Sequence, residues 1–119
     1  MEWDFTFSYT RAQAIADSVL IDVSDIAKEA GFKIPVALTS ALYDTYIKSD
    51  LPGQDEQGRL WDTLFMLYLR AKGCEESIIF YEVLFQMSES EQKTVKLKAI
   101  IGPGDTMDPV LTIMLPEED

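Results

Sequence analysis

The chain has 119 residues, of which 47% are hydrophobic and 26% charged, so residues 1–119 have the size and composition of one globular domain. Its 21 acidic and 10 basic residues give a formal net charge of −11. This charge argues against direct binding to nucleic acid or to an anionic membrane surface, because both need a concentrated Lys/Arg surface. The acidity is typical either of a surface that favours solubility or of one that attracts a basic partner.

The chain has one cysteine, Cys74, which excludes an internal disulfide. The residues before Thr10 lack the pattern of a signal peptide, and the longest strongly apolar stretch, Leu64–Leu69, is far shorter than the about 20 residues of a membrane-spanning helix. We therefore expect a cytoplasmic protein that does not enter a membrane.

The segment Trp3–Tyr9 alternates apolar and polar residues, which predicts a short strand with one buried face. Its aromatic side chains are expected in the core of the same chain. The alternative is an edge strand added to a second chain, which would make a homodimer. Thr10 and Gln13 have the spacing of a capping box and predict a helix that ends at about Asp17.

Val19–Val23 is rich in β-branched residues and predicts a second extended piece. Ser24 is expected to cap a helix of about two turns, because Gly31 stands where a C-terminal glycine is favoured. Pro35 suits the first turn of a further helix, which the helical spacing of apolar residues extends to about Ile47.

A loop over residues 49–55 precedes a helix that is apolar on more than one face, from Leu60 to Ala71, and that should end at Gly73. Alternation at period two then predicts three strands, at Ile79–Phe85, Val95–Ala99 and Leu111–Leu115. We expect an α+β fold in which N-terminal helices pack on a C-terminal three-stranded antiparallel meander, with an N-terminal edge strand as a possible addition.

Histidine is absent, which excludes a His-containing catalytic triad, and one cysteine cannot complete a zinc site. Cys74 stands beside Glu75 and Glu76, whose charges disfavour the thiolate of a nucleophile. The Gly102–Asp108 loop has two aspartates that could hold Ca²⁺, but we favour a hairpin connection with positive-φ glycines. We predict no catalytic residue, no metal site and no cofactor.

A mixed polar and aromatic block at residues 54–62 is the best candidate for a surface that binds a partner, since it lies where a loop meets a helix. Its candidate binding residues are Gln54, Asp55, Arg59, Trp61 and Asp62. Arg and Trp are enriched at interface hot spots. The alternative is that Trp61 belongs to the core and Arg59 pairs with Asp62 or Glu56.

Several blocks resemble a known family when taken in chain order. They are residues 9–17, 19–23, 30–32, 35–39, 58–62, 98–105 and 109–116. The chain is similar over nearly its whole length to a family of small uncharacterised bacterial proteins, classed as a domain of unknown function and often encoded on plasmids, phages and integrative elements. The sequence departs from the family pattern at Ser18, where relatives tend to have glycine, which argues against a tight positive-φ turn there. The stretch Lys48–Gln54, which varies in length, is a second departure.

The missing chemistry and this resemblance together favour a noncatalytic interaction or accessory protein of a mobile genetic element. One alternative is an anti-defence protein whose acidic surface mimics DNA, which would need a nearly unbroken acidic face. Lys96, Lys98, Arg59 and Arg70 weaken that alternative. Another alternative is an enzyme that uses carboxylates alone or with a hard metal ion.

Overall fold

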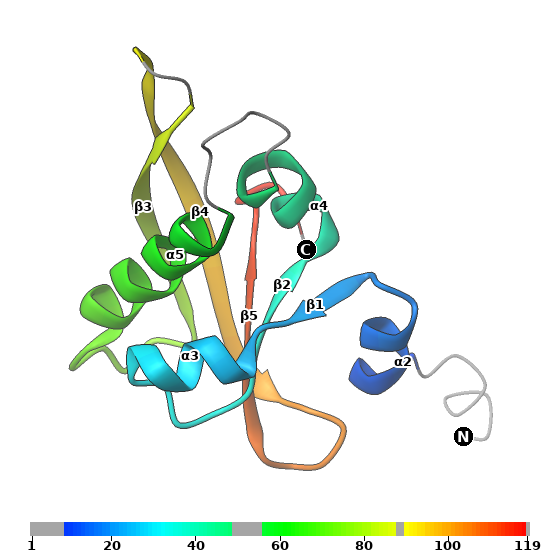
Figure 1. The fold of residues 1–119 in the computed structure, drawn as a ribbon. Helices are drawn as coiled ribbons and strands as arrows, with labels where there is room; N and C mark the ends of the chain where they lie inside the picture. Colours follow the sequence, from blue (N-terminus) through cyan, green and yellow to red (C-terminus); the bar gives the residue numbers. More distant parts are fainter. Residues whose placement is uncertain (1–8, 49–55, 88–89, 119) are drawn as a thin grey trace.

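A five-stranded mixed sheet forms the centre of the computed structural model, which describes residues 9–48, 56–87 and 90–118 (Figure 1). Its strands are β1 (Leu20–Asp22), β2 (Val36–Thr39), β3 (Ile78–Gln86), β4 (Gln92–Pro103) and β5 (Pro109–Met114). Their order in the sheet is β1-β2-β5-β4-β3. β2 and β5 run parallel, and the other neighbouring pairs are antiparallel.

The α+β class is confirmed, but the prediction of a sheet limited to three antiparallel strands is wrong. The sheet also contains β1 and β2, and β2 lies between β1 and β5. The residues after Pro35 form this strand instead of the first turn of a helix, and Val36, Ala37 and Leu38 are fully buried. A strand that is paired on both sides and buried on both faces has a continuous apolar run in its sequence, without alternating polar residues. Such a run cannot be distinguished from a segment of a buried helix by its periodicity.

The predicted helix at this place begins only at Ser40. It consists of one short turn, α4 (Ser40–Leu42), continued by a π-helical segment, η1 (Tyr43–Ile47). The hydroxyl of Thr39 accepts a hydrogen bond from the backbone N–H of Leu42 and so caps this segment. The C-terminal half of the predicted helix is therefore helical, and its N-terminal half is a strand.

Two helices, α3 (Ser24–Ala30) and α5 (Glu56–Ala71), lie on one face of the sheet (Figure 1). Gly31 ends α3 with φ at 120°, as the sequence predicts for a C-terminal glycine. A Cβ atom on Gly31 would lie 2.6 Å from Cε1 of Tyr68, so only glycine lets α3 approach α5 this closely. The ring of Phe32 packs edge to face on Tyr68, with 5.6 Å between the centroids.

The core lies between these helices and the sheet. Its largest fully buried side chains come from both layers and are Leu38, Leu42, Ile47, Leu64, Leu67, Ile79, Phe85, Leu97, Leu111 and Ile113. β3 alternates strictly between exposed and buried residues, as its sequence predicts. One face of β3 therefore belongs to the core, and the other face is exposed.

The remaining helix, α2 (Arg11–Ala16), packs against β1. The predicted capping box is confirmed: Thr10 Oγ1 accepts from the N–H of Gln13, and Gln13 Oε1 accepts from the N–H of Thr10. Ser18, which follows this helix, has φ at 62°. The expectation that a residue other than glycine argues against a positive-φ turn here is wrong, because the serine adopts this conformation itself.

Candidate functional site

The candidate binding residues of the sequence do not form one surface in the structure. Gln54 and Asp55 lie outside the described residues. Arg59, Trp61 and Asp62 all belong to the N-terminal half of α5, but Arg59 is buried, whereas Trp61 and Asp62 are exposed. Residues two positions apart on a helix are related by a rotation of about 200° around its axis and point to nearly opposite sides. Arg59 and Trp61 therefore cannot lie on the same face.

Arg59 joins three elements from within the protein. One terminal nitrogen donates to the carbonyl oxygen of Tyr46 at 2.9 Å, and the other donates to that of Gln86 at 2.6 Å. The side chain is only 8% exposed. Arg59 therefore links α5 to η1 and to the last residue of β3. Its role is to hold these three elements together and not to contact a partner.

Trp61 begins an apolar stripe along the outer face of α5. Its ring stacks on that of Phe65, with 6.0 Å between the centroids and an interplanar angle of 10°. Trp61, Phe65, Met66 and Leu69 are between 37% and 50% exposed, and we call these four residues the helix stripe. The alternative prediction that Trp61 belongs to the core is wrong, because the core-facing positions of α5 are taken by other residues such as Leu64 and Leu67.

The exposed face of β3, on the side of the sheet opposite α5, carries further apolar side chains. Ile78, Phe80 and Leu84 are about half exposed, and the Lys96 ammonium lies 5.5 Å from the centroid of the Phe80 ring. Ten large apolar side chains are exposed among the described residues, and seven of them belong to α5 and β3. They form two patches, one on the outer face of α5 and one on the opposite face of the sheet, and exposed apolar patches are typical of surfaces that bind another protein.

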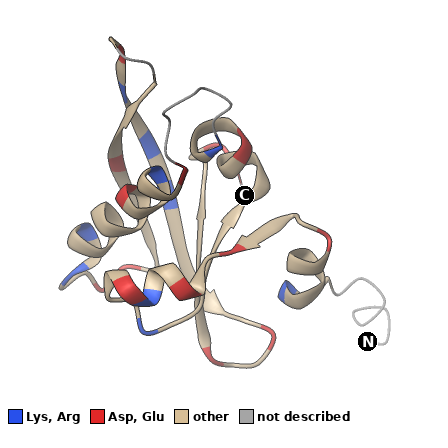
Figure 2. Cartoon of the chain, viewed as in Figure 1, with Lys and Arg blue, Asp and Glu red and all other residues tan. Residues whose placement is uncertain are grey.

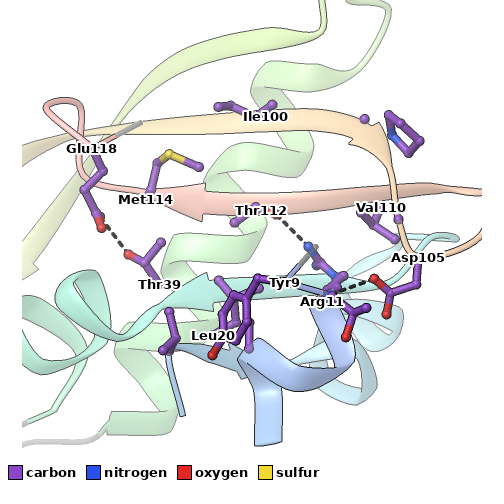
Figure 3. Close-up of a pocket in the computed structure, with 16 residues that line it drawn as sticks. Tyr9, Arg11, Leu20, Thr39, Ile100, Asp105, Val110, Thr112, Met114 and Glu118 are labelled. Carbon is purple, nitrogen blue, oxygen red and sulfur yellow. Dashed lines mark hydrogen bonds between the residues drawn. The ribbon is translucent and has the colours of Figure 1, made fainter. Parts of the chain in front are cut away.

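A larger groove lies elsewhere, between α2 and the sheet face that α3 and α5 leave uncovered (Figure 3). Its volume is about 730 Å³. Arg11 crosses it: one terminal nitrogen donates to Thr112 Oγ1 at 2.7 Å, and the other donates to the carbonyl of Leu111 at 2.9 Å. Partial burial lowers the pKa of the Arg11 guanidinium from its ordinary value, and the charges of Asp22 and Asp105 oppose that shift.

The carboxylates that line this groove are held in hydrogen bonds within the protein. Asp105 accepts from the backbone N–H groups of Arg11 and Ala12. Glu118 accepts from the hydroxyl of Thr39 and from the N–H of Leu115 (Figure 3). A ligand site normally presents convergent polar groups, and these groups instead brace the walls of the groove against each other.

Asp105 belongs to the Gly102–Asp108 loop, for which the predicted hairpin connection is confirmed between β4 and β5. The predicted positive φ angles of its glycines are wrong, since Gly31 and Gly73 are the glycines with positive φ in the described part of the chain. A Cβ on Gly104 would instead lie 2.8 Å from Cγ1 of Val110, so the loop needs the small size of glycine there.

The described residues contain no group of three or more His, Cys, Asp or Glu side chains that could hold a metal ion. Cys74 is half-buried just after the end of α5, and its backbone N–H donates to the carbonyl of Ala71. Some elements carry acidic and basic residues together, as α3 does with Asp25, Lys28 and Glu29 (Figure 2). In the ranges that the structure describes, no helix is long and apolar enough to cross a membrane.

Comparisons with other proteins identify the chain by family alone. No curated protein and no solved structure matches it. A family model described as "Family of unknown function (DUF6573)" matches residues 3–119, which is almost the whole chain. The chain therefore belongs to this family of unknown function, DUF6573.

Proposed function

We propose that this chain is a noncatalytic protein-interaction or accessory protein of a mobile genetic element, and that the helix stripe binds its partner. The genetic setting is supported by the family resemblance of the sequence. The interaction role is supported by one structural observation: Trp61, Phe65, Met66 and Leu69 expose a continuous apolar strip on the outer face of α5, in a chain with a net charge of −11.

The strip is large enough to matter energetically. With about 200 Å² for each large side chain, four residues at these exposures leave on the order of 350 Å² of apolar surface in water. At about 25 cal/mol per Å², its burial would contribute roughly 9 kcal/mol before the costs of association are subtracted. This contribution is comparable with the about 4–15 kcal/mol that association costs, so the strip offsets much of that cost and a partner must bury further surface to bind specifically.

The geometry of Trp61 also favours recognition. Its stack with Phe65 holds two large rings nearly parallel, so part of their rotational freedom is already lost in the free protein. Preordered aromatic side chains bind with a smaller entropic cost. We expect the Trp61–Phe65 pair to supply the hot spot of the interface.

The test is affinity capture from the native host with three tagged proteins: the unaltered chain, a stripe variant (Trp61→Ser/Leu69→Ser) and a matched control (Val19→Ser/Met107→Ser). The control also replaces two exposed apolar side chains, but away from α5. The stripe variant should retain its captured partners more than tenfold less well, because loss of a hot spot costs about 2 kcal/mol or more. The control should retain them fully.

Equal capture by all three proteins would exclude the helix stripe as the binding surface. Failure of the unaltered chain to capture any protein above background would count against the interaction role itself.

The two alternative functions, a DNA mimic and a carboxylate-dependent enzyme, are not supported by any comparable feature of the described residues. A DNA mimic needs an unbroken acidic face, and α3 and α5 each carry basic as well as acidic residues (Figure 2). An enzyme with paired carboxylates needs two acids free to act in one cleft. Asp105 and Glu118, which line the groove beside α2, each accept two hydrogen bonds from the protein.

A further inference from the structure

β3 is an outer strand of the sheet, and its backbone groups can be assigned to one side or the other. The carbonyl of Ser77 accepts from the N–H of Ile101 at 2.8 Å, and the N–H of Met87 donates to the carbonyl of Glu91 at 2.8 Å. In an antiparallel ladder, alternate residues point their backbone groups toward the same neighbour, so the odd-numbered residues of this strand face β4. The backbone N–H and C=O groups that face the open edge belong to Ile78, Phe80, Glu82 and Leu84.

The C-terminal end of this edge is closed. The carbonyl of Gln86 also points outward, and it accepts a hydrogen bond from Arg59 at 2.6 Å. The open stretch is therefore residues 78–84. A groove of about 450 Å³ lies along it, lined by Met66, Arg70, Phe80, Tyr81, Glu82 and Lys96. A long edge strand with apolar side chains is a template for an added strand.

We infer that this edge binds the N-terminal segment of a second copy of the chain, residues 2–8, as an added strand. The contact lies beside the helix stripe but uses β3, so it goes beyond the proposed function and does not depend on it. Residues 1–8 lie outside the described part of the chain, and what they contribute to the argument is their sequence.

That sequence is complementary to the edge. Trp3, Phe5 and Phe7 recur at every second position, which is also the spacing of the exposed residues of β3, where Ile78, Phe80 and Leu84 are apolar and Glu82 interrupts them. In an added strand that placed these rings opposite Phe80, Glu82 and Leu84 on the exposed face, two of the three pairs would be aromatic–apolar pairs, which stabilise sheets. Glu2 and Asp4 would then lie on the side of α5, where Arg70 lines the groove.

The segment cannot make this contact within its own chain. It joins the described fold at Tyr9, immediately before α2, which packs against β1, and β1 and β3 are the opposite outer strands of the sheet. Five strands span four spacings of about 4.8 Å, or roughly 19 Å. Eight extended residues reach at most about 29 Å, so roughly three residues would remain to pair with β3. The donor must be another copy.

The test compares the oligomeric state of the full chain with that of four variants, measured by light scattering over a concentration series. Glu82→Pro removes an N–H that points to the open edge and leaves the ladder with β4 intact. Glu82→Thr changes the same side chain and keeps that N–H. Phe5→Ser/Phe7→Ser alters the segment, and Phe80→Thr/Leu84→Thr alters the apolar side chains of the edge while it keeps strand-forming residues.

The full chain and Glu82→Thr should self-associate equally. Glu82→Pro and Phe5→Ser/Phe7→Ser should be monomeric, and Phe80→Thr/Leu84→Thr should weaken self-association about tenfold, since it removes two cross-strand pairs. Circular dichroism and urea unfolding of each variant will show whether it is folded. If Glu82→Pro does not fold, Phe80→Thr/Leu84→Thr decides the outcome for the edge.

Mixing provides the sharpest measurement. The segment variant keeps an intact β3 edge, and Glu82→Pro keeps an intact segment, so the two monomeric proteins should form a one-to-one complex when mixed. A full chain that is monomeric at every concentration would overturn the inference. So would self-association that persists in both edge variants, or that is lost only in the segment variant, because the segment would then bind elsewhere, such as in the groove beside α2.

Discussion

The carboxylate of Asp105 accepts hydrogen bonds from the backbone N–H of Arg11 at 2.6 Å and from that of Ala12 at 2.9 Å, across more than 90 residues of sequence. The β4–β5 loop thereby caps the first turn of α2 with an acidic group from a distant part of the chain. Arg11 donates in the opposite direction, to Thr112 and to the carbonyl of Leu111 on β5. α2 is therefore fastened to the same hairpin at two points.

Asp105→Ala should lower the free energy of unfolding by about 1–2 kcal/mol, because two N–H groups of α2 lose a charged acceptor. Urea denaturation measures the change. Asp108→Ala is the matched control in the same loop, since the Asp108 carboxylate makes one long hydrogen bond of 3.3 Å to Thr106 in the described structure. Equal effects of the two substitutions would mean that the contact with α2 contributes nothing.

Arg59→Met should destabilise the protein by about 3 kcal/mol, because the carbonyls of Tyr46 and Gln86 lose a charged donor inside the fold. Arg70→Met, an exposed position on the same helix, should change stability by less than about 0.5 kcal/mol. Chemical denaturation of both variants provides the comparison. Unchanged stability of Arg59→Met, together with loss of partner capture, would instead place Arg59 in the binding surface.

Ser18→Gly should raise the free energy of unfolding by about 1 kcal/mol, because glycine adopts the φ of 62° without the steric cost that a Cβ atom imposes. Ser18→Val should have the opposite effect, since a β-branched residue is strongly disfavoured in this region. Thermal and urea unfolding of the two variants measure both changes. A Ser18→Gly protein less stable than the parent would show that the serine side chain has a role of its own.

Stability should fall as the pH rises above about 10, the ordinary pKa of tyrosine. Burial raises the pKa of the Tyr81 phenol, whose hydroxyl donates to the carbonyl of Thr63 at 2.9 Å, so the folded protein keeps a proton that the unfolded chain releases. The contribution is therefore present below pH 10 and is lost as the pH rises toward the pKa of the folded state.

Urea unfolding between pH 8 and pH 11 measures this effect, since one proton contributes a slope of up to about 1.4 kcal/mol per pH unit. Tyr81→Phe should be less stable at neutral pH, because the hydroxyl no longer bonds to Thr63, but its stability should fall less steeply above pH 10. Identical slopes for the two proteins would show that Tyr81 does not titrate on unfolding.

Local patterns predicted the parts of this fold that depend on neighbouring residues. The capping box of Thr10 and Gln13 involves one helical turn, and the alternation of β3 reflects a strand with one buried and one exposed face. Both are visible in a short stretch of sequence. The strand at Val36–Thr39 depends instead on pairing with Leu111–Ile113, which no local pattern encodes.

The candidate site shows the same limit. Arg59 and Trp61 are two residues apart and attractive as an interface pair, but helix geometry directs one inward and the other outward. Trp61 could be identified from its residue type. That the helix stripe runs on to Leu69, and that Met66 lies beside the edge of β3, depends on how α5 lies on the sheet. The cap that Asp105 provides needs two segments brought together by the whole fold, so the sequence carries no signal for it.

The parallel pairing of β2 with β5 also affects the order of events during synthesis. Val36 emerges from the ribosome long before Leu111, its partner in the sheet. About 75 further residues must be synthesised before β5 can pair with the second edge of β2. Contacts between residues so distant in sequence slow folding, because a large loop must close before they form. The nascent chain therefore exposes an apolar strand until β5 has been made, and this interval is when a chaperone would be of most use.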